Sequence, residues 1–303
     1  MPASLAEDAP AKVNLTLRVV GRRGDGYHEL ESLVAFADFG DRLRFSPGGE
    51  LTLAVRGPSA QAAGEGADNL VLKAARALAA RCPGLAVGAF RLDKRLPVAA
   101  GLGGGSADAA AALRLLARAN GLAADDPRLY EAARATGADV PVCLEARPRI
   151  MRGVGELLSA PLDLPALPAV LVNPGVAVPT KAVFAAWTDG ARAAPVGAHL
   201  VALDLAAVAR LTSREQLLSF LAAQSNDLER PAIALAPAIA DVLAALRALP
   251  RCRLARMSGS GATCFALFSS AAAARAAAKI LRGKYRHWWV RAGTLNGAAP
   301  ARP

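Results

Sequence analysis

A glycine-rich stretch has the residue types of a phosphate-binding loop. It reads PVAAGLGGGSA from Pro97 to Ala107, with four glycines among its five central residues. Glycine lacks a Cβ, so this stretch can adopt positive φ and bring backbone N–H groups close to a ligand. The alanine-rich, amphipathic run from Ser106 to Asn120 predicts a helix directly after it. A helix that begins in such a loop points free amides and its positive dipole end at one spot, which suits phosphate.

The loop differs from two common phosphate-binding motifs. A P-loop needs Lys and Ser/Thr after its last glycine, and the dinucleotide motif G-x-G-x-x-G needs glycine in place of Ser106. The other interpretation is a tight turn before a core helix, although a plain turn rarely uses four glycines. We therefore expect a phosphate loop of a third kind. Its candidate nucleotide-binding residues are Pro97, Val98, Ala99, Ala100, Gly101, Leu102, Gly103, Gly104, Gly105, Ser106 and Ala107.

Two charged residues outside the loop are candidates for proton transfer and charge stabilisation. Lys12 lies in the alternating, β-rich segment Ala11–Val20, which predicts a strand with Lys12 and Asn14 on its polar face. Asp139 follows the end of a predicted helix and precedes Pro141, which we expect to keep the chain extended. From the residues alone, Lys12 could be a surface charge, and Asp139 could be a capping or solvated aspartate.

The composition is that of a folded protein with two domains. The chain has 303 residues, of which 53% are hydrophobic and 20% are charged. Proline is dense around residues 161–168, which predicts domains over 1–162 and 163–303. The net charge is +11, but the basic residues are dispersed and aromatics make up only 5% of the chain. The dispersed basic residues and few aromatics disfavour RNA binding. Binding of a polyanionic small substrate explains the positive net charge equally well.

The cysteines and the N-terminal sequence favour a cytoplasmic protein that does not bind membranes. Cys82, Cys143, Cys252 and Cys264 are scattered without metal-binding spacing, so we expect reduced, buried thiols. The N-terminus lacks the basic and apolar regions of a signal peptide. The uncharged stretch Leu164–Thr180 is too interrupted by proline to span a bilayer.

The order of predicted elements indicates an α+β fold. Strands are expected over 27–37 and 41–46, and Asp38-Phe39-Gly40 is interpreted as a strand end because no His-Arg-Asp loop accompanies this kinase-like triplet. Asp68-Asn69 is a plausible N-cap for a helix that runs to about Ala80. In the second half, helices that include one over 232–248 alternate with strands, which favours an antiparallel sheet.

Three motifs together resemble those of the GHMP small-molecule kinases. They are PAKVNL at 10–15, the glycine loop, and SGSGAT at 258–263. The resemblance implies a two-domain GHMP kinase fold. The N-terminal domain is then a ribosomal-protein-like ATP domain with a left-handed β-α-β crossover, which carries the ATP loop and the catalytic pair. The C-terminal domain is ferredoxin-like, α+β, and forms a wall of the substrate cleft.

Within the family, GRRGDGYHEL at 21–30 and GADVP at 137–141 resemble a kinase of the non-mevalonate isoprenoid pathway. This resemblance implies that ATP, with Mg²⁺, phosphorylates the 2-hydroxyl of a cytidine-diphosphate-linked polyol. No protein ligand for Mg²⁺ is predicted. A homoserine or mevalonate type of GHMP kinase is the alternative, followed by an RNA-binding protein. We expect a monomer or weak homodimer that binds neither nucleic acid nor membrane.

The resemblance also assigns roles to single residues. It makes Asp139 the general base, with Lys12 beside it to hold the carboxylate ionised and offset phosphoryl charge. The substrate-binding positions it implies are Tyr27 and His28 against the cytosine, with Asn14, Thr180 and Phe184 lining the same pocket. Asn69 and Lys94 match the adenine side of the ATP site. His199 and His287 match nothing and are interpreted as structural.

Overall fold

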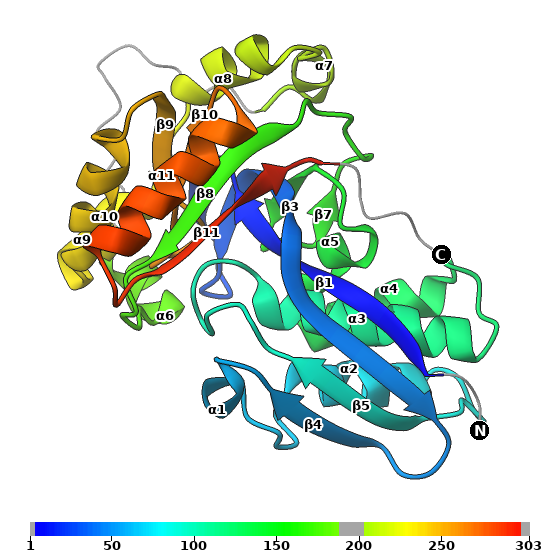
Figure 1. Cartoon of the computed structure of the whole chain (residues 1–303). Coiled ribbons are helices and arrows are strands. Elements are labelled where there is room, and N and C mark those ends of the chain that lie inside the picture. The colour runs from blue at the N-terminus through cyan, green and yellow to red at the C-terminus, as the bar shows by residue number, and fades with distance from the viewer. Residues whose placement is uncertain (1–3, 188–202, 298–303) are drawn as a thin grey trace. The chain divides into compact units, whose positions relative to one another are not determined.

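The computed structural model describes residues 4–187 and 203–297, and the chain divides into two compact units (Figure 1). The first unit contains the residues up to Lys12, Phe39–Val98 and Gly103–Ala146. The second contains Val13–Asp38, Ala99–Leu102 and the residues from Arg147 onward. Strands β1 and β3 and the glycine loop each have residues in both units. His199, which was interpreted as structural, lies outside the described residues.

The first unit is a layer of helices on one face of a mixed sheet (Figure 1). Strand β5 pairs antiparallel with the second half of β3 and parallel with β4. The strands of the first unit are β1 (Leu5–Asn14), β3 (His28–Pro47), β4 (Thr52–Arg56) and β5 (Gly88–Asp93). Its helices are α1 (Ala60–Ala63), α2 (Leu70–Ala79), α3 (Gly104–Ala119), α4 (Pro127–Thr136) and α5 (Val140–Glu145). Helix α3 packs against α2, α4 and α5, which is why ten of its residues are buried.

The second unit is an antiparallel sheet whose paired strands run in the order β3-β11-β8-β10-β9. Helix α11 packs against β8 and β11, and α10 packs against β9 and β10 (Figure 1). The strands are β2 (Arg18–Arg22), β6 (Arg149–Gly153), β7 (Leu157–Leu158), β8 (Leu167–Asn173), β9 (Cys252–Met257), β10 (Cys264–Phe268) and β11 (Trp289–Leu295). The helices are α6 (Thr180–Ala186), α7 (Leu205–Ala209), α8 (Arg214–Ala222), α9 (Glu229–Leu235), α10 (Ala238–Arg247) and α11 (Ala271–Lys284).

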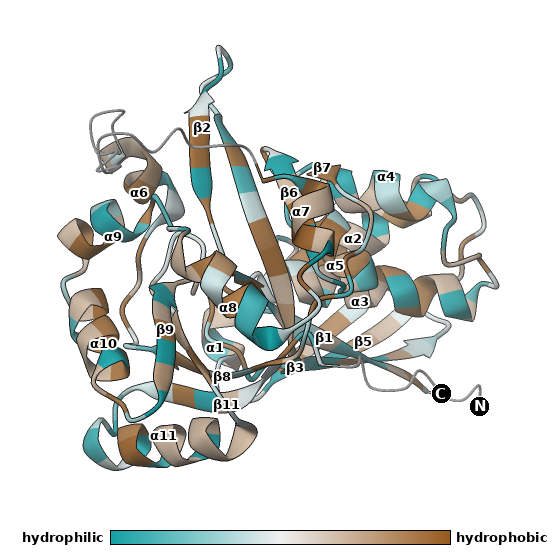
Figure 2. Cartoon of the chain, turned by 90° about the horizontal axis from the view of Figure 1, so that it is seen from above, coloured by the Kyte–Doolittle hydropathy of each residue, from teal (hydrophilic) through white to brown (hydrophobic). Residues whose placement is uncertain are grey.

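Several predicted features are confirmed by this architecture. The fold is α+β, and the sheet of the second unit is antiparallel. All four cysteines are free thiols, and Cys82, Cys143 and Cys264 are buried as predicted, whereas Cys252 is only half-buried. Strands β2 and β3 form a hairpin whose tip is hydrophilic (Figure 2). Within the described residues, no helix is both long and apolar enough to cross a bilayer.

The interpretation of Asp38-Phe39-Gly40 as a strand end is wrong, because β3 continues through it. A Cβ on Gly40 would collide with the carbonyl oxygen of Ala9, so the glycine allows β1 to approach β3 closely. The single strand predicted over Ala11–Val20 is also wrong, since β1 ends at Asn14 and β2 begins at Arg18.

Two prolines act differently from their predicted effect. Pro141 does not keep the chain extended after Asp139, because it occupies the first turn of α5, where its missing N–H costs nothing. The helix predicted over 232–248 is two helices, α9 and α10, separated at Ala236 and Pro237. The proline removes the N–H that a continuous helix would need there.

Candidate active site

The glycine loop leads into helix α3 as the sequence predicts. Gly103 is the N-cap of α3 in the left-handed conformation, with φ of 59°. The first backbone bond of the helix runs from Ala107 N–H to Gly103 O at 2.8 Å, so the amides of residues 104–106 precede it and are available to a ligand. A Cβ on Gly103 would lie 3.1 Å from Cβ and 3.2 Å from Cε of Lys12, so glycine lets the lysine side chain pass directly against the loop.

The start of the loop is held by the two other predicted motifs. In the second unit, Ser258 Oγ–H donates to Gly101 O at 2.8 Å and accepts from Asn14 N–H at 3.0 Å. Thr263 N–H donates to Ala100 O at 3.2 Å. A Cβ on Gly101, whose φ is 74°, would collide with the carbonyl oxygen of Ser258. Residues from two other parts of the sequence therefore fix the position of Ala100 and Gly101 in the loop.

Lys12 and Asp139 form an ion pair in the first unit, which we call the open pair. Lys12 Nζ donates to Asp139 Oδ2 at 2.7 Å, and the side chains are 5% and 37% exposed respectively. Asp139 is the N-cap residue of α5 by position, but its carboxylate makes no capping hydrogen bond. The carboxylate is thus held by the lysine and keeps an exposed edge that could meet a hydroxyl group.

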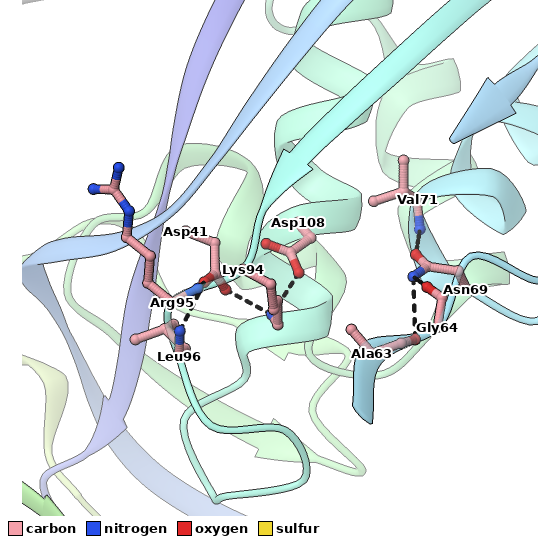
Figure 3. Close-up of polar contacts among 9 residues, drawn as sticks. All are labelled: Asp41, Ala63, Gly64, Asn69, Val71, Lys94, Arg95, Leu96 and Asp108. Atoms are coloured by element: carbon pink, nitrogen blue, oxygen red, sulfur yellow. Dashed lines mark hydrogen bonds and ion pairs between the residues drawn. The ribbon is translucent and has the colours of Figure 1, made fainter. Parts of the chain in front are cut away.

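Lys94 belongs to a second group of charges, the buried cluster, which also contains Asp41 and Asp108 (Figure 3). Lys94 Nζ donates to Oδ2 of both aspartates at 2.6 Å. Asp41 Oδ1 accepts the N–H groups of Arg95 and Leu96 at 2.6 and 2.8 Å. Burial alone would lower the pKa of Lys94, but Asp108 and Asp41 outweigh it and the pKa is raised. The ammonium is therefore a fixed charge.

Asn69 caps α2, as predicted, and its side chain is fully engaged in doing so. Its Oδ1 accepts Val71 N–H at 3.0 Å, and its Nδ2 donates to Gly64 O at 2.9 Å (Figure 3). These bonds join the end of α1 to the start of α2.

The predicted cytosine-side residues lie near one another in the second unit. The His28 ring stacks on Phe184 at a centroid distance of 5.0 Å, and Tyr27 is 66% exposed. Trp187, which the sequence analysis missed, packs edge-on against His28 at 5.6 Å and is buried. One indication of this contact is present in the sequence, because Trp187 follows Phe184 by about one helical turn, at the end of α6.

The other predicted substrate-side residues bond to neighbours in the same unit. Thr180 and Ser260 share a hydrogen bond of 2.8 Å between their hydroxyl groups. Asn14 Nδ2 donates to Ser32 Oγ at 2.7 Å, and Asn14 is buried. His287, interpreted as structural, packs edge-on against Trp288.

Cys143, on α5, is not a nucleophile. Burial raises the pKa of its thiol to about 12, with the charge of Asp139 adding to the effect.

Comparison with known proteins identifies the class of protein. The model for the GHMP kinases N terminal domain matches residues 69–147, and the model for GHMP kinases C terminal matches residues 201–287. The chain belongs to the GHMP kinase family, and it is an ATP-dependent small-molecule kinase. The predicted family and fold are confirmed.

Individual relatives are more specific. Two proteins named 4-diphosphocytidyl-2-C-methyl-D-erythritol kinase, from Rhodopseudomonas palustris strains BisB5 and HaA2, are 60% and 59% identical to the chain. The matches cover 97% and 98% of this chain and 99% and 100% of those proteins. A crystal structure of 4-(cytidine 5'-diphospho)-2C-methyl-D-erythritol kinase matches with a TM-score of 0.77 at 38% identity, covering 97% of this chain and all of that one. A homoserine kinase from Cytophaga hutchinsonii, at 19% identity and a TM-score of 0.69, shares the fold over 97% of this chain and 95% of its own.

Proposed function

We propose that the chain transfers the γ-phosphoryl group of ATP to the 2-hydroxyl of 4-diphosphocytidyl-2-C-methyl-D-erythritol, a step in making isoprenoid precursors. The names of the relatives at about 60% identity supply the substrate. The observation that carries the chemistry is the open pair, because a partly exposed carboxylate is held by a buried lysine next to the glycine loop.

In the proposed step, Asp139 accepts the proton of the hydroxyl as its oxygen attacks the γ-phosphorus. A new O–P bond forms, the bond between the γ-phosphorus and the β–γ bridging oxygen breaks, and ADP leaves. Lys12 keeps the carboxylate in place and offsets negative charge on the phosphoryl group during transfer.

The glycine loop is proposed to hold the ATP phosphates. The amides of Gly104, Gly105 and Ser106 and the N-terminal end of the α3 dipole supply donors and partial positive charge. We expect Mg²⁺ to arrive as part of the ATP substrate, bridging its phosphates. Across residues 4–187 and 203–297, no three His, Cys, Asp or Glu side chains are grouped as a metal site.

The substrate-side and adenine-side assignments complete the proposal. Tyr27 and His28 would stack on and hydrogen-bond the cytosine, with Asn14, Thr180 and Phe184 lining the same pocket. Because the polar atoms of Asn69 and Lys94 are engaged within the protein, we propose that these two residues shape the adenine side without donating side-chain hydrogen bonds to ATP.

Incubation of the protein with ATP and single candidate alcohols, followed by mass spectrometry, tests the proposal. We expect a gain of one phosphate on 4-diphosphocytidyl-2-C-methyl-D-erythritol and none on homoserine or mevalonate. Turnover of homoserine or mevalonate alone would overturn the substrate assignment. Domains over 1–162 and 163–303, a cytoplasmic location, and a monomer or weak homodimer stay predictions.

A further inference from the structure

The buried cluster is a group of charges that takes no direct part in the proposed phosphoryl transfer. We propose that Asp41, Lys94 and Asp108 form a positioning cluster for the start of α3, and that Asp108 takes up a proton when the ATP phosphates bind at the glycine loop. The inference rests on the proposed function, since it requires that the loop bind those phosphates.

The cluster ties three elements of the first unit to one another. Asp41 comes from β3, Lys94 directly follows β5, and Asp108 lies in the second turn of α3 (Figure 3). Each of the three residues is at most 4% exposed, and both ion pairs measure 2.6 Å. A buried ion pair with such geometry fixes position, because separating its members would leave charges unpaired inside the protein.

The ammonium of the cluster lies against the backbone that begins α3. A Cβ on Gly104 would sit 3.1 Å from Lys94 Nζ and 3.6 Å from Asp41 Oδ2. Gly104 therefore has to be small on its interior side, not only on the side of a ligand. An anion held by the amides of residues 104–106 lies close enough to sense the charge of the cluster, since little water separates them.

The cluster has one more carboxylate than its single ammonium can balance. When all three groups are ionised it carries one excess negative charge, and Asp108 Oδ1 is buried without a hydrogen-bond partner. Such an oxygen is costly as an anion, and protonation of Asp108 makes the cluster neutral. Burial raises the pKa of Asp108 to about 7, and the charge of Asp41 adds to the shift against the opposing effect of Lys94.

The elements packed around Asp108 contribute few other ionisable groups. From β3 and the end of β5 come Asp41 and Lys94, and from α5 comes the thiol of Cys143, which burial keeps neutral at ordinary pH. The buried faces of α2 and α4 are made of aliphatic side chains. Burial thus raises the pKa of Asp108, with Asp41 adding to the shift and Lys94 opposing it.

Phosphate binding and the protonation of Asp108 are then linked. A bound polyanion favours the neutral cluster, so it raises the pKa of Asp108 and the protein takes up a proton from solution. By reciprocity, nucleotide binds less tightly once the pH exceeds about 7. We expect the dissociation constant for ADP to rise about fivefold between roughly pH 6.5 and 8.5 because of this coupling.

Calorimetric titration of the full-length protein with ADP, in buffers of different ionisation enthalpy, measures the protons taken up. Asp108→Asn keeps the side-chain shape but cannot take up a proton at this position. Its calorimetric titration with ADP therefore measures the protons that ADP itself exchanges. Asp125→Asn, an exposed change in the same unit, is the matched control. The wild type and Asp125→Asn should take up more protons than Asp108→Asn, and the pH dependence that exceeds the contribution of ADP should be absent from Asp108→Asn. Equal proton uptake by all three proteins would overturn the coupling.

A spectroscopic measurement on the wild type keeps the inference testable if Asp108→Asn does not fold. The infrared difference spectrum on adding ADP should gain a protonated carboxylic-acid band, and its absence would overturn the coupling. The amide NMR signals of Gly104 and Gly105 test the loop assignment separately. A shift on adding ADP without proton uptake would refute the coupling alone, whereas no shift would refute the loop assignment and with it this inference.

Discussion

The open pair and the buried cluster have the same residue types and lie against neighbouring glycines, Gly103 and Gly104, yet they differ in exposure and charge balance. In the open pair one ammonium faces one carboxylate, which is 37% exposed. In the buried cluster one ammonium faces two carboxylates, neither of which is more than 4% exposed. A carboxylate that reaches solvent can meet a substrate hydroxyl, whereas a sealed one can act only through the backbone and its field. Exposure, not residue type, therefore separates a reacting group from a positioning one.

The largest expected difference between the two groups is in the rate of reaction. Asp139→Asn keeps the shape of the side chain but cannot accept a proton, so turnover should fall by about 10²–10⁴ with both substrates still bound. Steady-state kinetics and nucleotide titration measure the two effects. In the same assays Asp125→Asn should behave as the wild type does.

Lys12→Met removes the cation of the open pair and should lower turnover by about 10²–10³, the usual effect of losing one transition-state donor. Because the two residues act as one unit, the double variant Lys12→Met with Asp139→Asn should lose less than the two single losses combined. If the double variant loses the full product of the two single losses, Lys12 and Asp139 act independently and do not form one catalytic unit.

The loss of the lysine should lower stability more in the buried cluster than in the open pair. Lys94→Met leaves two buried carboxylates without their cation and should lower the free energy of unfolding by about 3–5 kcal/mol. Lys12→Met should cost about 1 kcal/mol or less, because Asp139 can be solvated when its partner is lost. Urea unfolding of both variants gives the values, and equal losses would erase the proposed difference in role.

A change in the second unit provides a contrast to both groups. His28→Ala should weaken binding of the cytidyl substrate by about 1–3 kcal/mol, the scale of one stacked base, and leave ATP binding almost intact. Separate Michaelis constants for the two substrates are the measurement. If both constants rise together, the contacts of His28 with Phe184 and Trp187 serve packing and not base recognition.

The buried cluster should also make stability depend on pH. Since the pKa of Asp108 is raised from 3.8 to about 7 in the folded protein, the folded state binds its proton more tightly than the unfolded chain does. The contribution of Asp108 to the free energy of unfolding should therefore fall as pH rises between those values and level off above them. The difference between wild type and Asp108→Asn, measured by urea unfolding across that range, isolates this contribution, and a difference that does not change with pH would contradict the raised pKa.

Local sequence signals predicted much of the fold. The helix after the glycine loop and the helix that begins after Asn69 follow from hydrophobic periodicity and a capping residue. The errors have tertiary causes. Gly40 was interpreted as part of a strand end, but a glycine is required there because Ala9, from a distant part of the chain, packs directly against it.

Within the candidate site, the open pair was predicted only through resemblance to a family. Its members are 127 residues apart, and no local pattern brings them together. The buried cluster was missed, although Asp108 is a charged residue on a helix whose neighbouring positions are alanine. An aspartate in such a run indicates a buried partner, but only the fold shows that the partner is Lys94 and that Asp41 shares it.

Rapid-quench measurement of a single turnover most directly tests whether the open pair performs the chemistry. ATP and 4-diphosphocytidyl-2-C-methyl-D-erythritol would be mixed at saturation with wild type, Asp139→Asn and Asp125→Asn, and the transferred phosphate followed in time. If Asp139 is the base, the transfer step itself slows by about 10²–10⁴ in Asp139→Asn and is unchanged in Asp125→Asn. Transfer at the wild-type rate in folded Asp139→Asn would show that the carboxylate takes no part in the reaction.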